Sequence, residues 1–388
     1  MVNIYLRLVS AFHALHATRT NQTSLLSLEL GRPALIKEED CNVGMPSPID
    51  DRYMHSGNGW LSPTPEQSIS PLLPTIQVVG GIAKLLRVLK SRHLSKTSWE
   101  AYDSHFKGCM QEFPVYQQIR TNHYVDPIEL PPIMYLQNAR LMLHRHNLTP
   151  TSAAQDRIAA LDHCASTAAD TARLLRRCMQ ETPSMSRSSA TEHNTTWGQR
   201  MVSAASAFLC THIWRCALFL SFRSDFENAI WCAQASATLG ASRPVNVACG
   251  RYLQFFLKEL VTKVKQGKQI DTNEDLIAYV SGDLQGSFEN SWIWKGTKGD
   301  VYLGSPLQSQ TVVGDENGKA RLDTNTSEWD EWDNILGLLD DLFIEKQREQ
   351  QQRVIQESSL RPPLMLPPLA PSPNSTSPSN RMSIRDLI

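Results

Sequence analysis

The stretch DRIAALDHCASTAADTARLLRRCMQ, residues 156–180, gives the clearest indication of the fold class. Its apolar side chains recur at alternating steps of three and four residues, the spacing that puts side chains on one face of an α-helix. These side chains are Ile158, Leu161, Ala165, Ala168, Ala172, Leu175 and Met179. The central alanines are small enough to let a second helix approach closely. The stretch therefore predicts a long helix inside a helical core.

The same period continues on both sides of this stretch. Further helices are expected after Pro74, over residues 95–112 with Ser95 as the cap, from Pro131, and over about residues 200–222, 224–239, 244–265 and 273–281. No run alternates apolar and polar residues in the manner of a strand. The sequence therefore predicts an all-α fold: an irregular multi-helix domain with long proline-rich loops.

Composition narrows the class of protein. The chain has 388 residues with a formal net charge of -1, so no basic field draws it onto nucleic acid or an anionic membrane. Its eight cysteines form no C-x-x-C pair, and Cys164, Cys178 and Cys249 lie on apolar helical faces, which indicates reduced core residues. Residues 201–222 are long enough to span a membrane. His212 and Arg215 interrupt this run at its centre, so we expect a buried helix and no membrane.

Residues 323–345 form an acidic and aromatic segment with eight acids and no base. One helical face of it carries Trp329, Trp332, Leu336, Leu339 and Phe343. This face has two interpretations: it docks on the body of the protein, or it binds a partner as an amphipathic activation segment. Docking is favoured, because two tryptophans are costly to leave in water.

Known catalytic signatures are absent from the sequence, including phosphate-binding loops, the G-x-S-x-G motif and the H-E-x-x-H motif. Asp340, Asp341 and Glu345 form a DDxxE pattern of the kind that isoprenoid cyclases use to hold magnesium. A second ligand motif, which such a site needs, is missing. The sequence thus predicts no enzyme and no catalytic residue. The alternative that stays open is a helical enzyme of the cyclase type, or a small-molecule-binding protein.

Two histidine-containing fragments are candidates for metal ligands: His144-Arg145-His146 and Asp162-His163-Cys164. Adjacent residues on a helix point in different directions and cannot close one tetrahedral site. We therefore expect no metal site, and we expect these residues to be exposed or hydrogen-bonded on helix faces.

A sharp corner is predicted where a helix over residues 24–30 ends. Gly31 can adopt the left-handed cap conformation, and Pro33 prevents the helix from resuming. Arg32 lies between them, and Glu38, Glu39 or Asp40 is close enough in sequence to accept it as an ion-pair partner. The corner is a structural motif formed by Gly31, Arg32, Pro33 and Asp40.

The stretch SLLSLELGRPALIKEEDCNVGMPSPIDDRYM, residues 24–54, resembles an element of the fungal-specific transcription factor domain. That domain is the middle homology region of fungal binuclear zinc cluster regulators. The positions in register are Leu30, Gly31, Arg32, Pro33, Ile36, Asp40, Cys41, Val43, Pro46, Asp50 and Asp51. Residues 134–150, MYLQNARLMLHRHNLTP, resemble a helix of the same domain that ends in Leu-x-Leu-His-Arg-Pro, with His146 in place of the proline.

The resemblance implies an all-helical regulatory domain over residues 1–285, incomplete at its N-terminus, and a protein of the nucleus that regulates RNA polymerase II transcription. An irregular segment over 286–326, an acidic amphipathic helix over 327–357 and a disordered proline-rich tail over 358–388 are expected to follow. The family binds DNA through a six-cysteine zinc cluster that this sequence lacks. No DNA-binding residue and no zinc or other cofactor is therefore expected in this chain. Coregulators, a homologous factor or a small-molecule inducer are the expected partners.

Overall fold

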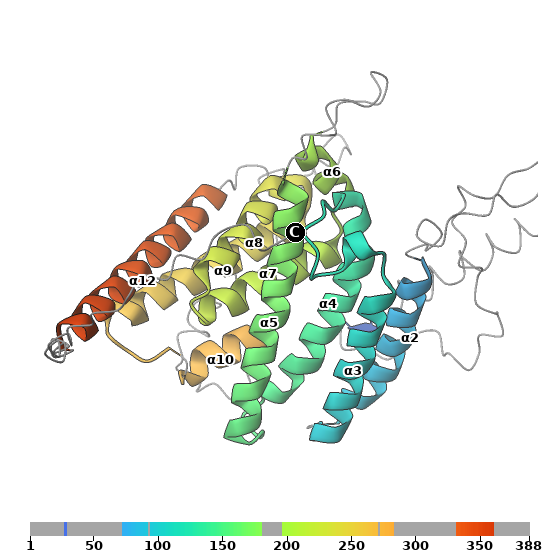
Figure 1. Cartoon of the computed structure of the whole chain (residues 1–388), viewed down its shortest axis with the longest axis horizontal. Helices are drawn as coiled ribbons and strands as arrows, with labels where there is room; N and C mark the ends of the chain where they lie inside the picture. Colours follow the sequence, from blue (N-terminus) through green and yellow to red (C-terminus); the bar gives the residue numbers. More distant parts are fainter. Residues whose placement is uncertain are drawn as a thin grey trace, which may run out of the picture. The chain divides into compact units, whose positions relative to one another are not determined.

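The computed structural model describes residues 27–28, 72–91, 94–180, 196–270, 272–282 and 331–360. Within these ranges the fold is all-α, with ten α-helices, four short 3-10 helices and no strand. The α-helices are α2 (Leu72–Val88), α3 (Lys96–Glu112), α4 (Leu130–Arg145), α5 (Ala154–Met179), α6 (Trp197–Ala204), α7 (Ala207–Phe222), α8 (Phe226–Leu239), α9 (Pro244–Lys265), α10 (Glu274–Ser281) and α12 (Trp332–Leu360) (Figure 1). The 3-10 helices are η3 (Val115–Gln117), η4 (Pro127–Glu129), η5 (His146–Leu148) and η7 (Gly240–Ser242). The expected all-α class is confirmed.

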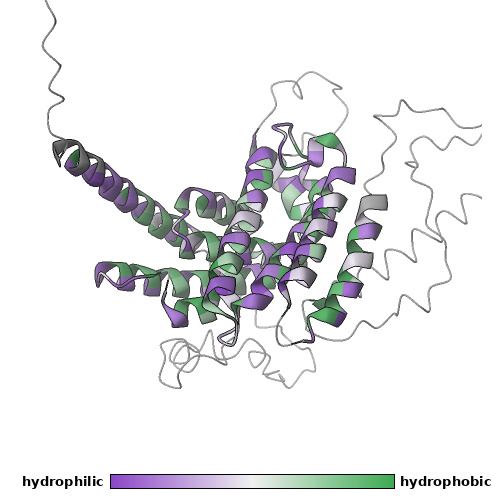
Figure 2. Cartoon of the chain, turned by 60° about the horizontal axis from the view of Figure 1, so that its bottom comes forward, coloured by the Kyte–Doolittle hydropathy of each residue, from purple (hydrophilic) through white to green (hydrophobic). Residues whose placement is uncertain are grey.

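The chain divides into two compact units, Met1–Phe343 and Ile344–Ile388. In the first unit α5 packs against α4, α7 and α8, and α7 also packs against α9 (Figure 1). The predicted central helix is therefore confirmed. In the second unit α12 continues to Leu360 as a helix with mostly hydrophilic residues (Figure 2).

The buried face of α5 overlaps the predicted face only in part: of the seven predicted side chains Ile158 is exposed, and Ala165 and Met179 are only partly buried. Cys164, Ala168, Thr171 and Leu175 are buried, whereas Ile158 is 59% exposed. A helix turns by about 100° per residue, so Ile158 lies about 120° around the helix from the centre of the buried face. Its inclusion in the predicted face was wrong, because the buried face also takes in the polar side chains of Thr167 and Thr171 and is therefore centred further from Ile158 than the apolar period alone indicated.

The helix predicted over about residues 200–222 is two helices, α6 and α7, which meet at an angle of 109°. Ser206 separates them: its backbone is extended, and its Oγ accepts a hydrogen bond from the N–H of Leu209 at 3.1 Å. A serine in this position caps a new helix. Among the described residues no single helix is long and apolar enough to cross a membrane; α6 and α7 reach the necessary length and composition only as a bent pair.

The contact between α2 and α3 depends on a glycine. A Cβ atom added to Gly81 would lie 2.8 Å from Nε2 of His105 and 3.1 Å from Cε1 of Phe106. Helix α2 begins at Leu72, three residues before the start expected after Pro74, and Pro74 lies inside its first turn, where proline is tolerated. Further upstream, Ser27 and Leu28 are helical, and Leu28 is buried in the core, as expected for a helix before the corner.

The first turns of α12 pack into the core of the first unit. Trp332, Ile335, Leu339 and Leu342 are at most 4% exposed, and Leu336 and Phe343 are partly buried against the same core. The side chain of Gln254 on α9 donates a hydrogen bond to Glu331 just before this helix. These contacts agree with the docking interpretation of the acidic and aromatic segment. Trp329, which was assigned to the same face, lies outside the described residues.

Seven cysteines lie within the described ranges, and all are buried thiols that form no disulfide there. Burial raises the pKa of the Cys216 thiol to about 12 and that of Cys109 to about 11, so both are protonated at neutral pH. The expectation that Cys164, Cys178 and Cys249 serve as small core residues is confirmed.

Candidate functional site

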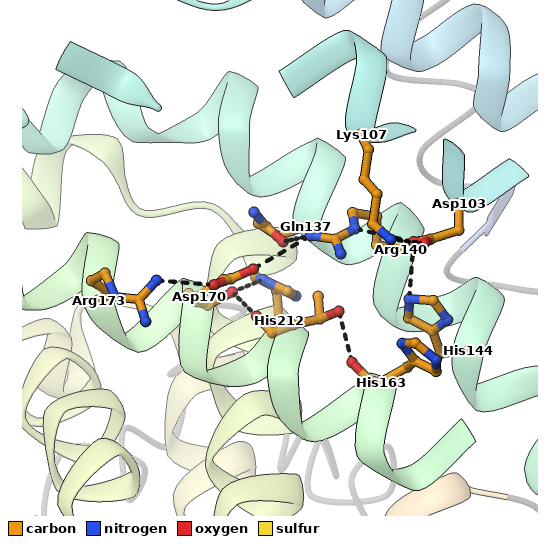
Figure 3. A network of polar contacts seen from close by, with 11 residues as sticks. Asp103, Lys107, Gln137, Arg140, His144, His163, Asp170, Arg173 and His212 are labelled. Carbon is orange, nitrogen blue, oxygen red and sulfur yellow. Dashed lines mark hydrogen bonds and ion pairs between the residues drawn. The ribbon is translucent and has the colours of Figure 1, made fainter. Parts of the chain in front are cut away.

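A network of charged and polar side chains lies between α3, α4 and α5 (Figure 3). We call it the α3–α5 polar network. Its members are Asp103, Lys107, Gln137, Arg140, His144, His163, Asp170 and Arg173. Helix α3 supplies the first two, α4 the next three and α5 the last three. The network connects these three helices through charged and polar contacts.

Asp103 is the point at which α3 contacts α4. Its Oδ2 lies 2.5 Å from Nζ of Lys107, one turn further along α3. Its Oδ1 lies 3.6 Å from Nε of Arg140 and 3.4 Å from Nε2 of His144. Burial alone would raise the pKa of this carboxyl, but His144, Lys107 and Arg140 outweigh burial and lower the pKa below its usual value. Asp103 is therefore an anion enclosed by basic groups.

His144 and His163 form a stacked pair, which we call the histidine pair. Their ring centroids are 5.0 Å apart and the rings are inclined by 22°. The indole of Trp99 contacts both rings, with centroids 5.2 Å from His144 and 4.6 Å from His163. The side chain of His144 is fully buried, whereas that of His163 is partly exposed. Burial lowers the pKa of both imidazoles, so both rings are neutral at neutral pH.

A second branch of the network runs from Arg140 to α5. Nη1 of Arg140 lies 3.5 Å from Oδ2 of Asp170 and donates to Oε1 of Gln137 at 3.3 Å. Oδ1 of Asp170 accepts a hydrogen bond from Nη1 of Arg173 at 3.2 Å. Burial raises the pKa of the Asp170 carboxyl, and the two arginines partly oppose this rise. Arg140 thus connects Asp103 on α3 with Asp170 on α5.

His212 on α7 lies next to this network (Figure 3). The hydroxyl of Thr171 donates to the carbonyl of Thr167 at 3.2 Å, so its oxygen accepts from Nε2–H of His212 at 3.1 Å. This contact assigns the proton of the neutral ring to Nε2. Burial, followed by the charge of Arg215, lowers the pKa of His212 to about 3. His212 is a neutral core residue.

Several buried polar atoms in the described part of the network have no hydrogen-bond partner. These atoms are Oδ1 of Asp103, Nε of Arg140, Nε2 of Gln137, and both ring nitrogens of His144. Oδ1 of Asp103 thus lies 3.6 Å from Nε of Arg140 and 3.4 Å from Nε2 of the neutral His144 ring without hydrogen-bond geometry. Such atoms are costly in a protein interior. The packing of the surrounding helices therefore holds these side chains in place. A change of charge within the network should strongly change the stability of the contacts between these helices.

The network contains two titratable imidazole rings that lie against each other. Within the described ranges no three or more His, Cys, Asp or Glu side chains converge in a way that could hold a metal ion. His144 and His163, expected on helix faces as exposed or hydrogen-bonded residues, do converge. For His144 that expectation was wrong, because its ring is fully buried and neither nitrogen has a hydrogen-bond partner. His146 agrees with it: Nε2–H donates to the carbonyl of Ser91 at 2.8 Å.

One signal in the sequence indicates the network. Gln137, Arg140 and His144 follow one another at steps of three and four within an otherwise apolar helix. This spacing places polar side chains on one face of α4. Charged residues at such positions almost never occur in a core unless they are paired. The partners on α3 and α5 are far away in the chain, and their identity does not follow from the spacing.

The other residues singled out from the sequence lie elsewhere. Gly31, Arg32, Pro33 and Asp40 are outside the described residues. Asp340, Asp341 and Glu345, the DDxxE pattern, are exposed on α12. Comparison of the chain with protein-family models, with curated proteins and with solved structures finds no match.

Proposed function

We propose that this protein regulates transcription by RNA polymerase II in the nucleus, as a regulatory domain of the fungal zinc-cluster type. The observation that carries the proposal is the corner motif. Leu30, Gly31, Arg32 and Pro33 are followed at the family's spacing by Asp40-Cys41 and by an extended run with proline and aspartate. A glycine, an arginine, a proline and an acid at this spacing are expected to form a helix stop held by an ion pair.

Two structural features support the proposal. The described part of the chain is all-α, as a domain of this family would be. Helix α4 ends at Arg145, and η5 begins at His146, the position at which the family's element has its proline. A proline at this point is compatible with the end of a helix. The element that resembles the family therefore ends where the family's pattern ends its helix.

Recognition of DNA would come from a separate module. Specific readout needs basic and amide side chains presented to the major groove together with phosphate contacts from Lys and Arg. The sequence contains no six-cysteine cluster, and its net charge of -1 gives no long-range attraction to DNA. In the proposed role this chain acts on transcription through coregulators or a DNA-binding partner, and a small-molecule inducer is a further class of effector.

A reporter assay in fungal cells tests the proposal. The 388-residue chain is fused to a heterologous DNA-binding domain whose binding site lies upstream of a reporter gene. We expect the fusion to change reporter transcription relative to the DNA-binding domain alone, and the chain to accumulate in the nucleus. An Arg32→Ala fusion should lose the effect, whereas Lys84→Ala, at an exposed position on α2, should keep it. Reporter transcription that stays unchanged by a well-expressed nuclear fusion would contradict the proposal.

A binding assay tests the role of DNA. We expect the isolated chain to select no sequence from a random duplex library at physiological salt, measured by fluorescence anisotropy. Enrichment of one motif with affinity that resists added salt would show that this chain contains its own reading surface.

A further inference from the structure

The histidine pair lies at the point where α3, α4 and α5 meet. Trp99 comes from α3, His144 from α4 and His163 from α5, and the rings contact one another at centroid distances of 4.6–5.2 Å. The described core of α3 is small, since the helix buries only Asp103, Phe106 and Cys109. The contact of α3 with the other two helices therefore depends strongly on the state of these rings.

The groups around the histidine pair oppose the addition of a proton to either ring. The charged groups that act on the pair are Asp103 and Lys107 from α3, Arg140 from α4 and Asp162 from α5. Asp103 attracts a proton on either ring, but it is already in contact with Lys107 and Arg140. Neither nitrogen of His144 has a hydrogen-bond partner, so an N–H formed on Nδ1 would be buried without an acceptor. With the rings 5.0 Å apart, a proton on one also repels a proton on the other.

We propose that the histidine pair is an acid-operated latch: with both rings neutral it holds α3 against α4 and α5, and proton uptake releases α3. The latch would operate whether or not the protein regulates transcription. It gives the chain a response to pH that is confined to one part of the fold.

The direction of the effect follows from the pKa shifts. Burial lowers the pKa of both rings below the ordinary value of 6.5, the value that they regain when α3 opens and water reaches them. Between the lowered and the ordinary pKa the open state binds more protons than the closed state. The latch is therefore fully closed above about pH 6.5 and weakens as the pH falls below it. The opening equilibrium constant rises by up to about tenfold per pH unit for each ring that gains a proton.

Hydrogen exchange measured by mass spectrometry on the full chain tests the latch, at about pH 7.5 and about pH 5.5, on either side of the ordinary histidine pKa. After correction for the intrinsic exchange rate, we expect α3 to lose protection about tenfold or more at the lower pH while α7 and α9 keep theirs. His163→Gln should reduce this loss, because one titrating ring is removed. His123→Gln is the matched control, since this exposed ring lies in the loop after α3 and should leave the loss unchanged.

Lys107→Met separates the latch from a merely structural role of the network. Removal of this cation makes proton uptake easier in the closed state and brings the pKa of the closed state nearer to that of the open state, so α3 should lose less protection at the lower pH than in the wild type. A structural role alone would lower α3 protection equally at both pH values. The latch is overturned if wild-type α3 is equally protected at both pH values, or if His163→Gln keeps the full acid loss. Parallel loss in α7 would also overturn it, by pointing to global unfolding or to His212.

Discussion

Replacement of Arg177 by alanine should lower the free energy of unfolding by about 3 kcal/mol. Arg177 lies on α5 and is 3% exposed, and its guanidinium group holds the loop that follows α3. Nε donates to the carbonyl of His123 at 2.7 Å, and Nη1 donates to the carbonyl of Gln118 at 2.8 Å. Nη2 donates to Oγ1 of Thr121 at 3.0 Å and to the carbonyl of Tyr116. One side chain thus organises a turn of the backbone.

The magnitude follows from these four hydrogen bonds. Each intramolecular hydrogen bond contributes about 1 kcal/mol net, which gives about 4 kcal/mol for the set. Alanine also removes the Arg177 donor from the carbonyl oxygens of Tyr116 and His123, whereas the carbonyl of Gln118 still accepts from the N–H and the hydroxyl of Thr121. Arg120, Asn122 and His123 are exposed, so water can reach part of the loop and replace some of the lost contacts, which reduces the expected loss to about 3 kcal/mol. Burial lowers the pKa of Arg177, but a guanidinium still carries its charge at neutral pH.

Urea unfolding followed by circular dichroism measures the effect, and two variants make it specific. Arg177→Lys keeps the charge but has only one nitrogen, so it should lose more than half of the stabilisation. Arg176→Ala is the matched control: its neighbouring side chain is half exposed, lies 3.8 Å from Glu227 and contacts the ring of Trp231, and it should cost less than about 1 kcal/mol. An Arg177→Ala protein no less stable than Arg176→Ala would refute the loop-holding role.

Three further changes test other contacts. Gly81→Ala should lower the melting temperature because a methyl group meets α3, whereas Gly80→Ala has open space and should stabilise α2 by up to about 1 kcal/mol; the reverse order would contradict the close helix contact. A double-mutant cycle on Asp126 and Arg200, whose Oδ1 and Nε lie 2.9 Å apart, should show a coupling of about 1 kcal/mol in thermal unfolding, and zero coupling would count against this ion pair. Arg32→Ala should cost roughly 1–3 kcal/mol if the predicted corner exists, and a melting curve unchanged from the wild type would speak against it.

The helices could be predicted because their apolar period is strong. Ser95 caps α3 as expected, with its Oγ accepting from the N–H of Ser98 at 3.2 Å, and α5 spans the predicted stretch. The break between α6 and α7 was missed because apolar residues continue on both sides of it. Only Ser206 marks the break, and a serine inside an apolar run is ambiguous between a helix interior and a cap.

The polar network could not be assembled from the sequence because its parts are far apart in the chain. Asp103 and Arg140 are on different helices, and no local spacing connects them. Arg177 shows the same limit: a basic residue in the last turn of a helix is expected in solvent, near the negative end of the helix dipole. Only the fold brings the loop carbonyls around it and converts it into a buried donor.

The contacts of Asp103 and those of Arg177 both act on one part of the chain, from α3 to the loop before α4. The Asp103 contacts place α3 against α4, and Arg177 fixes the loop that follows α3 to α5. Apolar burial places a helix with little directional preference, whereas ion pairs and bidentate donors fix its register. Helix α7, in contrast, buries most of its length in the apolar core. Segments with few buried apolar contacts open first in native proteins. Even at neutral pH, α3 should therefore exchange its amide hydrogens before α7, and Arg177→Ala should accelerate exchange in the loop before α4 more than in α7.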